Sequence, residues 1–190
     1  MARSIAAVDY FVIRPDPCCR SERDFWLKKR TDVAMAHMFI LIDSLNAATT
    51  ECDTQAMLQF VQTQPNADAR RVGAVGYCMS GPIVMWAAAI SPNHLRCIAS
   101  IHGASISTVA PDSPHRMAPL IHCDTYFACA EIDKWAPPAD IALLQEVPQI
   151  ASRHATPHRM VFGCRAWLCI FAARGCRQQS RRATALFAAV

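Results

Sequence analysis

The residues with the clearest chemical potential form a short turn around a cysteine, Gly76–Gly81, which reads Gly-Tyr-Cys-Met-Ser-Gly. The apolar segment Val72–Tyr77 leads into this turn, and the apolar segment Pro82–Ile90 follows it directly. A strand, a sharp turn and a helix in this order form a nucleophile elbow, which holds one side chain in a strained turn above a helix N-terminus. Cys78 occupies that position. A buried structural cysteine is the alternative interpretation, because most unpaired thiols are structural, and the elbow favours the nucleophile.

An elbow requires a parallel sheet to carry it, and the sequence predicts one. Five short segments rich in β-branched and aromatic residues are bounded by turn signals. These predicted strands are Asp9–Arg14, Val72–Tyr77, Cys97–His102, Thr125–Ala130 and Arg159–Phe162. Helical segments separate most of them, and this alternation is typical of a parallel sheet covered by helices on both faces. The sequence therefore predicts the α/β class.

Four predicted helices accompany these strands. Thr31 or Asp32 can cap the first, whose apolar positions recur at three- to four-residue spacing as far as Leu45. Asp53 is the predicted cap of the second helix, which Pro65 ends. The other two predicted helices are Pro82–Ile90, directly after the elbow, and Pro138–Glu146.

Length and composition indicate one folded domain. The chain has 190 residues, of which 53% are hydrophobic and 18% charged, and this balance is globular rather than disordered. No segment predicts a membrane span, because Ile83–Ile90 is too short and Arg165 interrupts the apolar stretch after Met160. No signal peptide is predicted either, because Asp9 interrupts the apolar run that begins at Ile5.

The ten cysteines do not form a pattern typical of secreted or metal-binding proteins. The chain is too long and too rich in core residues for a small disulfide scaffold. No Cys-x-x-Cys pair recurs, so the sequence predicts no metal site and no cofactor. We therefore expect a cytoplasmic protein whose thiols are mostly reduced.

The charge is divided unevenly along the chain. Up to Glu146 there are twelve Lys and Arg against fifteen Asp and Glu, a net charge of −3. After Glu146 come seven arginines and no acidic residue, a net charge of +7. Such a tail can bind nucleic acid or an anionic surface. A tail without that role is the favoured interpretation, because no aromatic residues interleave with the arginines and no helical stripe collects them.

Three motifs in order resemble the dienelactone hydrolase family of α/β hydrolases. They are GYCMSGP at Gly76–Pro82, ASIHG at Ala99–Gly103 and CAEIDKWAPP at Cys129–Pro138. The segment VIRPDPCCRSERDFWLKK also resembles the family's region after its fourth strand. The resemblance extends from about Ile5 to about Phe162, and it implies an α/β-hydrolase-like sheet in residues 1–162.

The resemblance implies a site as well as a fold. Cys78 would be a thiolate that attacks the carbonyl carbon of a lactone or an activated ester. Asp133, at the carboxyl end of a strand, would orient a catalytic histidine, and the backbone N–H of Met79 would form half of an oxyanion hole. Without its motif, Asp133 would be interpreted as a solvated loop carboxylate. The expected partner is a small-molecule ester or lactone, not nucleic acid or a membrane, and the sequence does not indicate an oligomeric state.

The family's catalytic histidine is the part of the motif set that the sequence lacks. Members of the family carry it in a Gly-x-x-His-Gly-Phe turn, whereas this chain reads Gly-Cys-Arg-Ala-Trp-Leu-Cys-Ile-Phe over Gly163–Phe171, and no histidine follows His158. A DNA sequence that encodes these nine residues can also encode Gly-Ala-Glu-His-Gly-Phe-Ala-Phe when its reading frame is shifted by one base. We therefore hypothesise a reading-frame slip near Phe162–Gly163, which makes residues 163–190 a basic tail unlike the family. A structural or solvated role is the favoured interpretation of each remaining histidine, and His102, at a strand end, ranks first among them as a substitute.

The resemblance also implies missing structure before the elbow, where only Asp9–Arg14 is a predicted strand. The family's first strands, the loop that completes the oxyanion hole and a glutamate near the thiol are expected to be absent, and Met1 to be an internal start or a truncation. One absent strand belongs between Asp9–Arg14 and Val72–Tyr77, and its loss would leave two strand edges unpaired. An inactive fragment of such a hydrolase is therefore the alternative function. A basic-tailed binding or thiol-redox protein ranks last.

Overall fold

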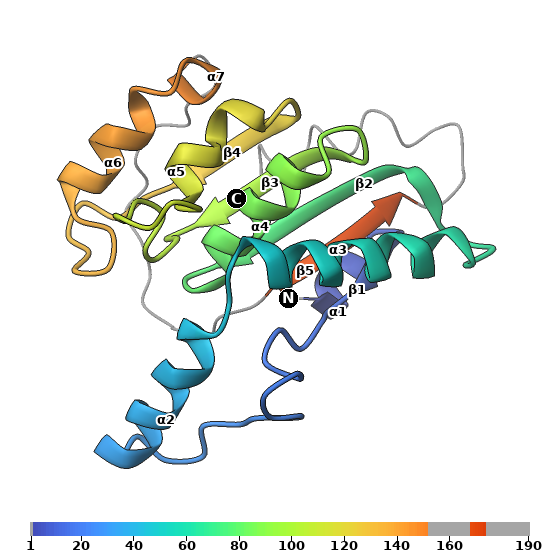
Figure 1. Cartoon of the computed structure of the whole chain (residues 1–190). Coiled ribbons are helices and arrows are strands. Elements are labelled where there is room, and N and C mark those ends of the chain that lie inside the picture. Colours follow the sequence, from blue (N-terminus) through green and yellow to red (C-terminus); the bar gives the residue numbers. More distant parts are fainter. Residues whose placement is uncertain (1, 152–167, 174–190) are drawn as a thin grey trace.

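A five-stranded sheet forms the centre of the computed structural model, which describes residues 2–151 and 168–173 (Figure 1). The strands are β1 (Tyr10–Ile13), β2 (Asp68–Tyr77), β3 (Leu95–Ile101), β4 (Asp124–Ala128) and β5 (Leu168–Ala173). Their order across the sheet is β1-β5-β2-β3-β4. β2, β3 and β4 are parallel to one another, whereas β5 runs antiparallel to β1 on one side and to β2 on the other.

The predicted α/β class and four of the five predicted strands are confirmed. β1, β3 and β4 lie within one or two residues of the predicted bounds, and β2 begins four residues earlier than predicted. The fifth predicted strand, Arg159–Phe162, lies outside the described residues. The predicted boundary between a family-like domain and a tail at residue 162 stays a prediction.

The prediction of an unpaired gap in the sheet is wrong. β5 lies in the position between β1 and β2, where Ile170 is paired with Ile13 on one side and with Ala74 on the other (Figure 1). A segment that the sequence assigned to the basic tail therefore completes the sheet. The run Leu-Cys-Ile-Phe is apolar and includes residues that favour strands, and backbone pairing with β1 and β2 places it in this position.

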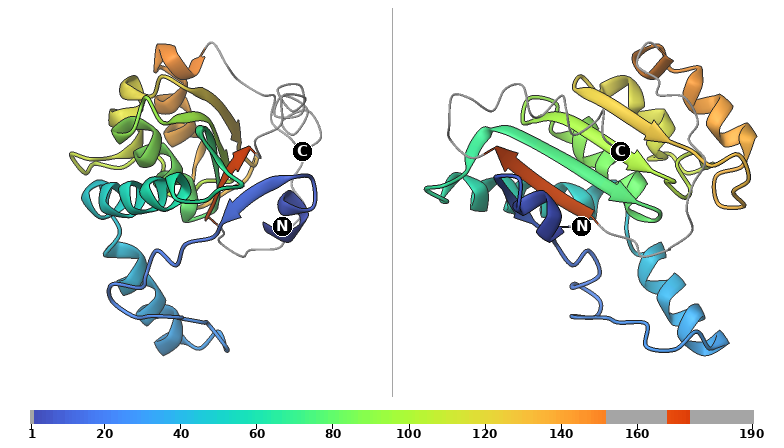
Figure 2. Two further views of the ribbon diagram at one scale, coloured as in Figure 1. Left: turned by 90° about the vertical axis from the view of Figure 1, so that its right-hand side faces the viewer. Right: turned by 180° about the vertical axis from the view of Figure 1, so that it is seen from behind.

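The helices cover the two faces of the sheet unequally. They are α1 (Ala2–Ala6), α2 (Asp32–Asp43), α3 (Ala47–Gln62), α4 (Ser80–Ile90), α5 (Pro114–Met117), α6 (Pro138–Gln145) and α7 (Pro148–Ala151), with a 3₁₀ turn at Ala118–Leu120. In the left view of Figure 2, α3, α4 and α6 lie on one side of the sheet and α1 on the other. Within the described residues, α1 is the only helix on that second face.

Alternate residues of the parallel strands supply the two apolar layers. Ala74 and Ile98 are buried in the large core under α3 and α4, whereas Val75 and Ala99 are buried in the smaller layer with Ile5 of α1. Successive side chains of a strand point to opposite faces, so a strand buried on both sides is apolar throughout. This double burial agrees with the mostly apolar or small residues of Val72–Tyr77 in β2 and Cys97–Ile101 in β3.

The start of α3 differs from the prediction, and the start of α2 agrees with it. Thr31 caps α2, where its hydroxyl accepts the N–H of Ala34 at 3.2 Å. The cap of α3 is Asn46, seven residues before the predicted cap, in a capping box in which the side chains of Asn46 and Thr49 accept each other's backbone N–H. Asp53 instead lies inside the helix, and the structure gives it a different role.

α2 projects away from the body of the molecule (Figure 1), and Leu41 is its one buried residue. Within residues 2–151 and 168–173 no single helix is long and apolar enough to cross a membrane. Taken together, α2 and α3 are long and apolar enough by length and composition alone, but the pair is bent by 76° at the break between them.

Candidate active site

Cys78 lies in the turn between β2 and α4, and its backbone is in the left-handed region with φ 53°. Three backbone hydrogen bonds hold this conformation. The Cys78 N–H donates to the Ile101 carbonyl at 3.0 Å, and the Cys78 carbonyl accepts the N–H groups of Gly81 at 2.9 Å and of Ala104 at 3.0 Å. A left-handed conformation costs a side chain with a Cβ about 1–2 kcal/mol. The turn therefore has the strained strand-to-helix geometry of a nucleophile elbow.

Gly76 and Ser80 let β2 and α4 approach closely at this turn. A Cβ on Gly76 would lie 2.1 Å from the Ser80 carbonyl oxygen, so no larger residue fits without moving the helix. The Ser80 side chain is buried and small enough for the same close approach. Its presence at this position is compatible with a tight elbow.

A second close contact joins the start of α4 to the loop after β3. A Cβ on Gly81 would lie 2.5 Å from the Cα of Gly103, and a Cβ on Gly103 would lie 2.4 Å from Oγ of Ser100. Both glycines belong to the motifs that carry the family resemblance. Their spacing brings the loop that begins at His102 against the elbow.

Met79 is the N-cap residue of α4, with φ −56° and ψ −18°. Its backbone N–H donates no hydrogen bond within the described part of the chain. The first N–H groups of a helix point away from its body and carry the positive end of the helix dipole. Met79 therefore stands next to Cys78 at the positive end of α4.

Asp133 lies in the loop after β4, at the edge of the sheet where β2 and β3 also end. We call this edge the carboxyl edge and define it by Cys78, His102 and Asp133. The half-buried Asp133 carboxylate accepts the N–H of Trp135 at 2.8 Å, and the Trp135 carbonyl accepts the N–H of Ser105, also at 2.8 Å. These two bonds fix the Asp133 loop to the loop that follows β3.

His102 is the histidine that the structure brings to the carboxyl edge. It follows β3 with φ 41°, and its N–H donates to the Ala128 carbonyl at 2.6 Å. The ring lies edge-on to Tyr77, with 5.9 Å between the ring centroids. Burial lowers the pKa of His102, and the negative charge of Asp133 acts in the opposite direction. His154, His158 and the turn Gly163–Trp167 lie outside the described residues.

Burial suppresses the thiolate form of some other cysteines in the described chain, Cys97 and Cys129 among them. Burial in β3 raises the pKa of Cys97 to about 12, with the neighbouring Cys123 as a smaller cause. Burial also raises the pKa of Cys129, and the charge of Asp133 adds to this effect. In the described residues no group of three or more His, Cys, Asp or Glu side chains could hold a metal ion.

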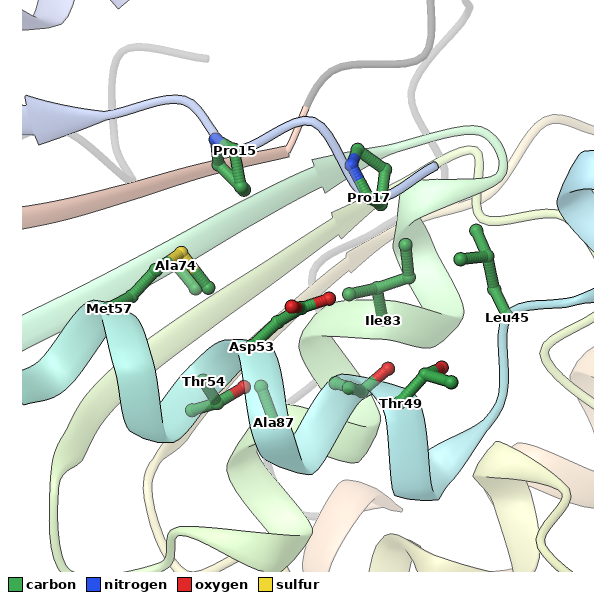
Figure 3. Close-up of a pocket in the computed structure, with 11 residues that line it drawn as sticks. Pro15, Pro17, Leu45, Thr49, Asp53, Thr54, Met57, Ala74, Ile83 and Ala87 are labelled. Atoms are coloured by element: carbon green, nitrogen blue, oxygen red, sulfur yellow. The ribbon is translucent and has the colours of Figure 1, made fainter. Parts of the chain in front are cut away.

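The structure contains a small cavity that does not belong to this site. It lies between α3, α4 and the segment after β1, and Pro15, Thr54, Met57 and Ile83 are among its lining residues (Figure 3). Its volume of about 10 Å³ has room for about one water molecule. None of the three residues of the carboxyl edge lines it.

Sequence reasoning missed the residues that support the site. Trp135 and Ser105 connect the two loops through backbone atoms, and Tyr77 contacts the ring of His102. Trp135 belongs to the motif CAEIDKWAPP, so the sequence could have indicated that it lies near Asp133. No pattern in the sequence signals the Ser105 bond, because a backbone N–H donates whatever its side chain is.

Two comparisons with known proteins agree with this geometry. The model of the family described as "Dienelactone hydrolase family" matches residues 1–158. A protein of Synechocystis sp. (strain ATCC 27184 / PCC 6803 / Kazusa) described as "Putative carboxymethylenebutenolidase" is 26% identical over 124 residues. That match covers 63% of this chain and 48% of the relative, so the chain spans about half the length of the relative it matches. The elbow, the loop motifs and the family model lead to one conclusion: the chain belongs to the dienelactone hydrolase family.

Proposed function

We propose that this chain hydrolyses lactones or activated carboxylic esters and that Cys78 is the nucleophile. The observation that carries the proposal is the left-handed backbone of Cys78 in the turn between β2 and α4. A functional side chain held in a strained turn is typical of the nucleophile in this kind of hydrolase. Family membership supports the reaction class, and the substrate is a small molecule with an ester or lactone carbonyl.

In the proposed reaction the Cys78 thiolate attacks the carbonyl carbon, and the carbonyl oxygen becomes an oxyanion. The Met79 N–H and the positive end of α4 stabilise this charge. Collapse of the intermediate expels the alcohol group and leaves a thioester on Cys78. Water then hydrolyses the thioester and regenerates the thiol. Asp133 supports the proton transfers through its negative charge at the carboxyl edge.

An inactive fragment of a family hydrolase is the alternative function. Two observations favour it: the matched relative is about twice the aligned length, and the sequence Gly163–Phe171 lacks the family's histidine. A cytoplasmic location, as expected from the thiols, is part of the main proposal and of the alternative. Nucleic acid and membrane partners belong to neither.

Hydrolysis of an aryl acetate by the purified chain tests the proposal. We expect slow turnover that Cys78→Ala lowers by at least about a hundredfold, because a missing nucleophile removes the covalent route. Cys52→Ala is the matched control, since Cys52 is exposed on α3, and it should keep the wild-type rate. A wild-type rate equal to that of Cys78→Ala would favour the inactive fragment.

A further inference from the structure

His102 and Cys78 hold equivalent places on neighbouring strands. Tyr77 and Ile101 are the last paired residues of β2 and β3, so Cys78 and His102 come next across the two parallel strands. The 3.0 Å bond from the Cys78 N–H to the Ile101 carbonyl continues the ladder to this point. Neighbouring strands lie about 4.8 Å apart, so the two backbones meet at the same place on the carboxyl edge.

The imidazole of His102 carries a polar atom without any structural partner. Its Nδ1 is buried and has no hydrogen-bond partner within the described residues. A buried polar group of this kind is costly, and in native proteins it often marks a functional role. The ring is held edge-on against Tyr77, the residue that precedes the nucleophile.

The electrostatics of the ring suit a proton acceptor. Burial lowers the pKa of His102, so the imidazole is neutral near pH 7. Asp133 is the charged group that acts on it, and its negative charge favours the imidazolium form. The ring of Tyr77 faces the imidazole from β2. Within residues 2–151 and 168–173 the Asp133 carboxylate accepts a hydrogen bond from Trp135, and it acts on His102 through its charge.

We propose that His102 is the general base of this chain and accepts the thiol proton of Cys78. The inference rests on the proposed function, because it assigns a base to that nucleophile. The S–H bond breaks, its proton passes to the His102 imidazole, and the sulfur electron pair forms the bond to the carbonyl carbon. The imidazolium then gives its proton to the departing alkoxide. In the second half, water loses its proton to the imidazole as it attacks the thioester, and the proton returns to the Cys78 sulfur.

The proposed proton transfer takes place when a substrate is bound. Catalytic hydrogen bonds are often long before substrate binds and tighten in the reacting complex, directly or through one water. In the proposal the proton passes from Cys78 to His102 once a substrate occupies the carboxyl edge, directly or through one water.

Peptide-resolved alkylation of the full chain with iodoacetamide from pH 5 to pH 10 tests the inference without needing hydrolysis. In the wild type we expect the alkylation of Cys78 to reach half its maximum below the ordinary thiol value of about 8.5. In His102→Asn the midpoint should move up toward that value, and the rate at pH 7 should fall at least about tenfold. Asparagine accepts left-handed backbone readily, so this variant keeps φ 41°.

His94→Asn is the matched control, because His94 is exposed in the loop before β3, and it should leave the Cys78 profile unchanged. The exposed Cys19 and Cys52 report whether either variant changes thiol chemistry in general. An unchanged Cys78 midpoint in a folded His102→Asn protein would overturn the inference. A Cys78 alkylation midpoint of about 8.5 in the wild type would also overturn the inference, and this measurement requires no variant. The alkylation profile of Cys78 could depend on His102 in a chain that shows no esterase activity. This result would contradict the proposed function but support the proton transfer between the two residues.

Discussion

The two halves of the sheet are assembled in different ways. β2, β3 and β4 are parallel, follow one another along the chain and carry the carboxyl edge. β1 and β5 come from opposite ends of the chain and are antiparallel to each other, with β5 joined to β2. The first half is built by local crossovers and close glycine contacts, and the second by one long-range pairing. In this chain the three residues of the carboxyl edge all follow strands of the parallel half.

The largest test of this comparison changes β5. Ile170→Pro removes a backbone N–H from a strand with neighbours on both sides; in a helix interior proline costs about 3 kcal/mol or more, and we expect a similar cost from the lost ladder bond here. We expect the free energy of unfolding, measured by chemical denaturation, to fall by at least that amount. Ile170→Val is the control, because it keeps the strand propensity. Equal stability of the two variants would show that β5 does not occupy this position.

A smaller loss of stability is expected where β2 meets α4. Gly76→Ala places a Cβ 2.1 Å from the Ser80 carbonyl oxygen, and backbone cannot yield as a flexible side chain can. We expect a loss of about 2 to 3 kcal/mol by denaturant titration, the range of overpacking in a core. Ser21→Thr adds a methyl group at an exposed site and should change stability little. A stable Gly76→Ala protein would contradict the close packing of the elbow.

The backbone strain at Cys78 predicts that glycine is more stable than alanine there, the opposite of their order within a helix. Glycine adopts φ 53° without penalty, so Cys78→Gly should be more stable than Cys78→Ala by about 1 kcal/mol. At Ala56, an exposed position within α3, alanine should instead be more stable than glycine by about 1 kcal/mol. Thermal melting of the four proteins measures both differences. The same sign at both positions would mean that Cys78 is not strained.

The smallest expected effect lies at the start of β2, where the two halves meet. The hydrogen bond from Arg70 is the main cause that lowers the pKa of Asp68, and Arg71 also contributes. A carboxyl whose folded pKa is lowered stabilises the protein above its unfolded value, 3.8 here, and this contribution disappears as the pH falls through the folded value. Asp68→Asn should therefore cost about 0.5 kcal/mol at pH 7, the scale of a surface ion pair.

Denaturation of both proteins at pH 7 and at pH 3 measures this effect. The difference between wild type and Asp68→Asn should be larger at pH 7. A difference that grows toward pH 3 would contradict the lowered pKa of Asp68.

The sequence predicted the local half of the sheet well and the long-range half poorly. β3, β4 and α4 have clear periods and turn residues; the elbow motif predicted Cys78 in the turn after β2, and a separate motif predicted Asp133 after β4. Asp53 was misread as a helix cap because its side chain pairs with Arg20, 33 residues earlier, at 2.8 Å. β5 was missed because nothing within the segment shows that β1 and β2 lie on either side of it. The buried Nδ1 of His102 likewise depends on packing that no local pattern records.

The central place of β5 has a consequence for how the chain is made. Tyr10 leaves the ribosome long before Ala173, the residue it is paired with in the finished sheet. Folding during synthesis can complete β2, β3 and β4 early, because they follow one another along the chain. β1 must wait for one of the last segments to arrive, and such distant pairings form slowly. We therefore expect the nascent protein to carry a finished elbow on an unfinished sheet, in which state it would depend most on chaperones.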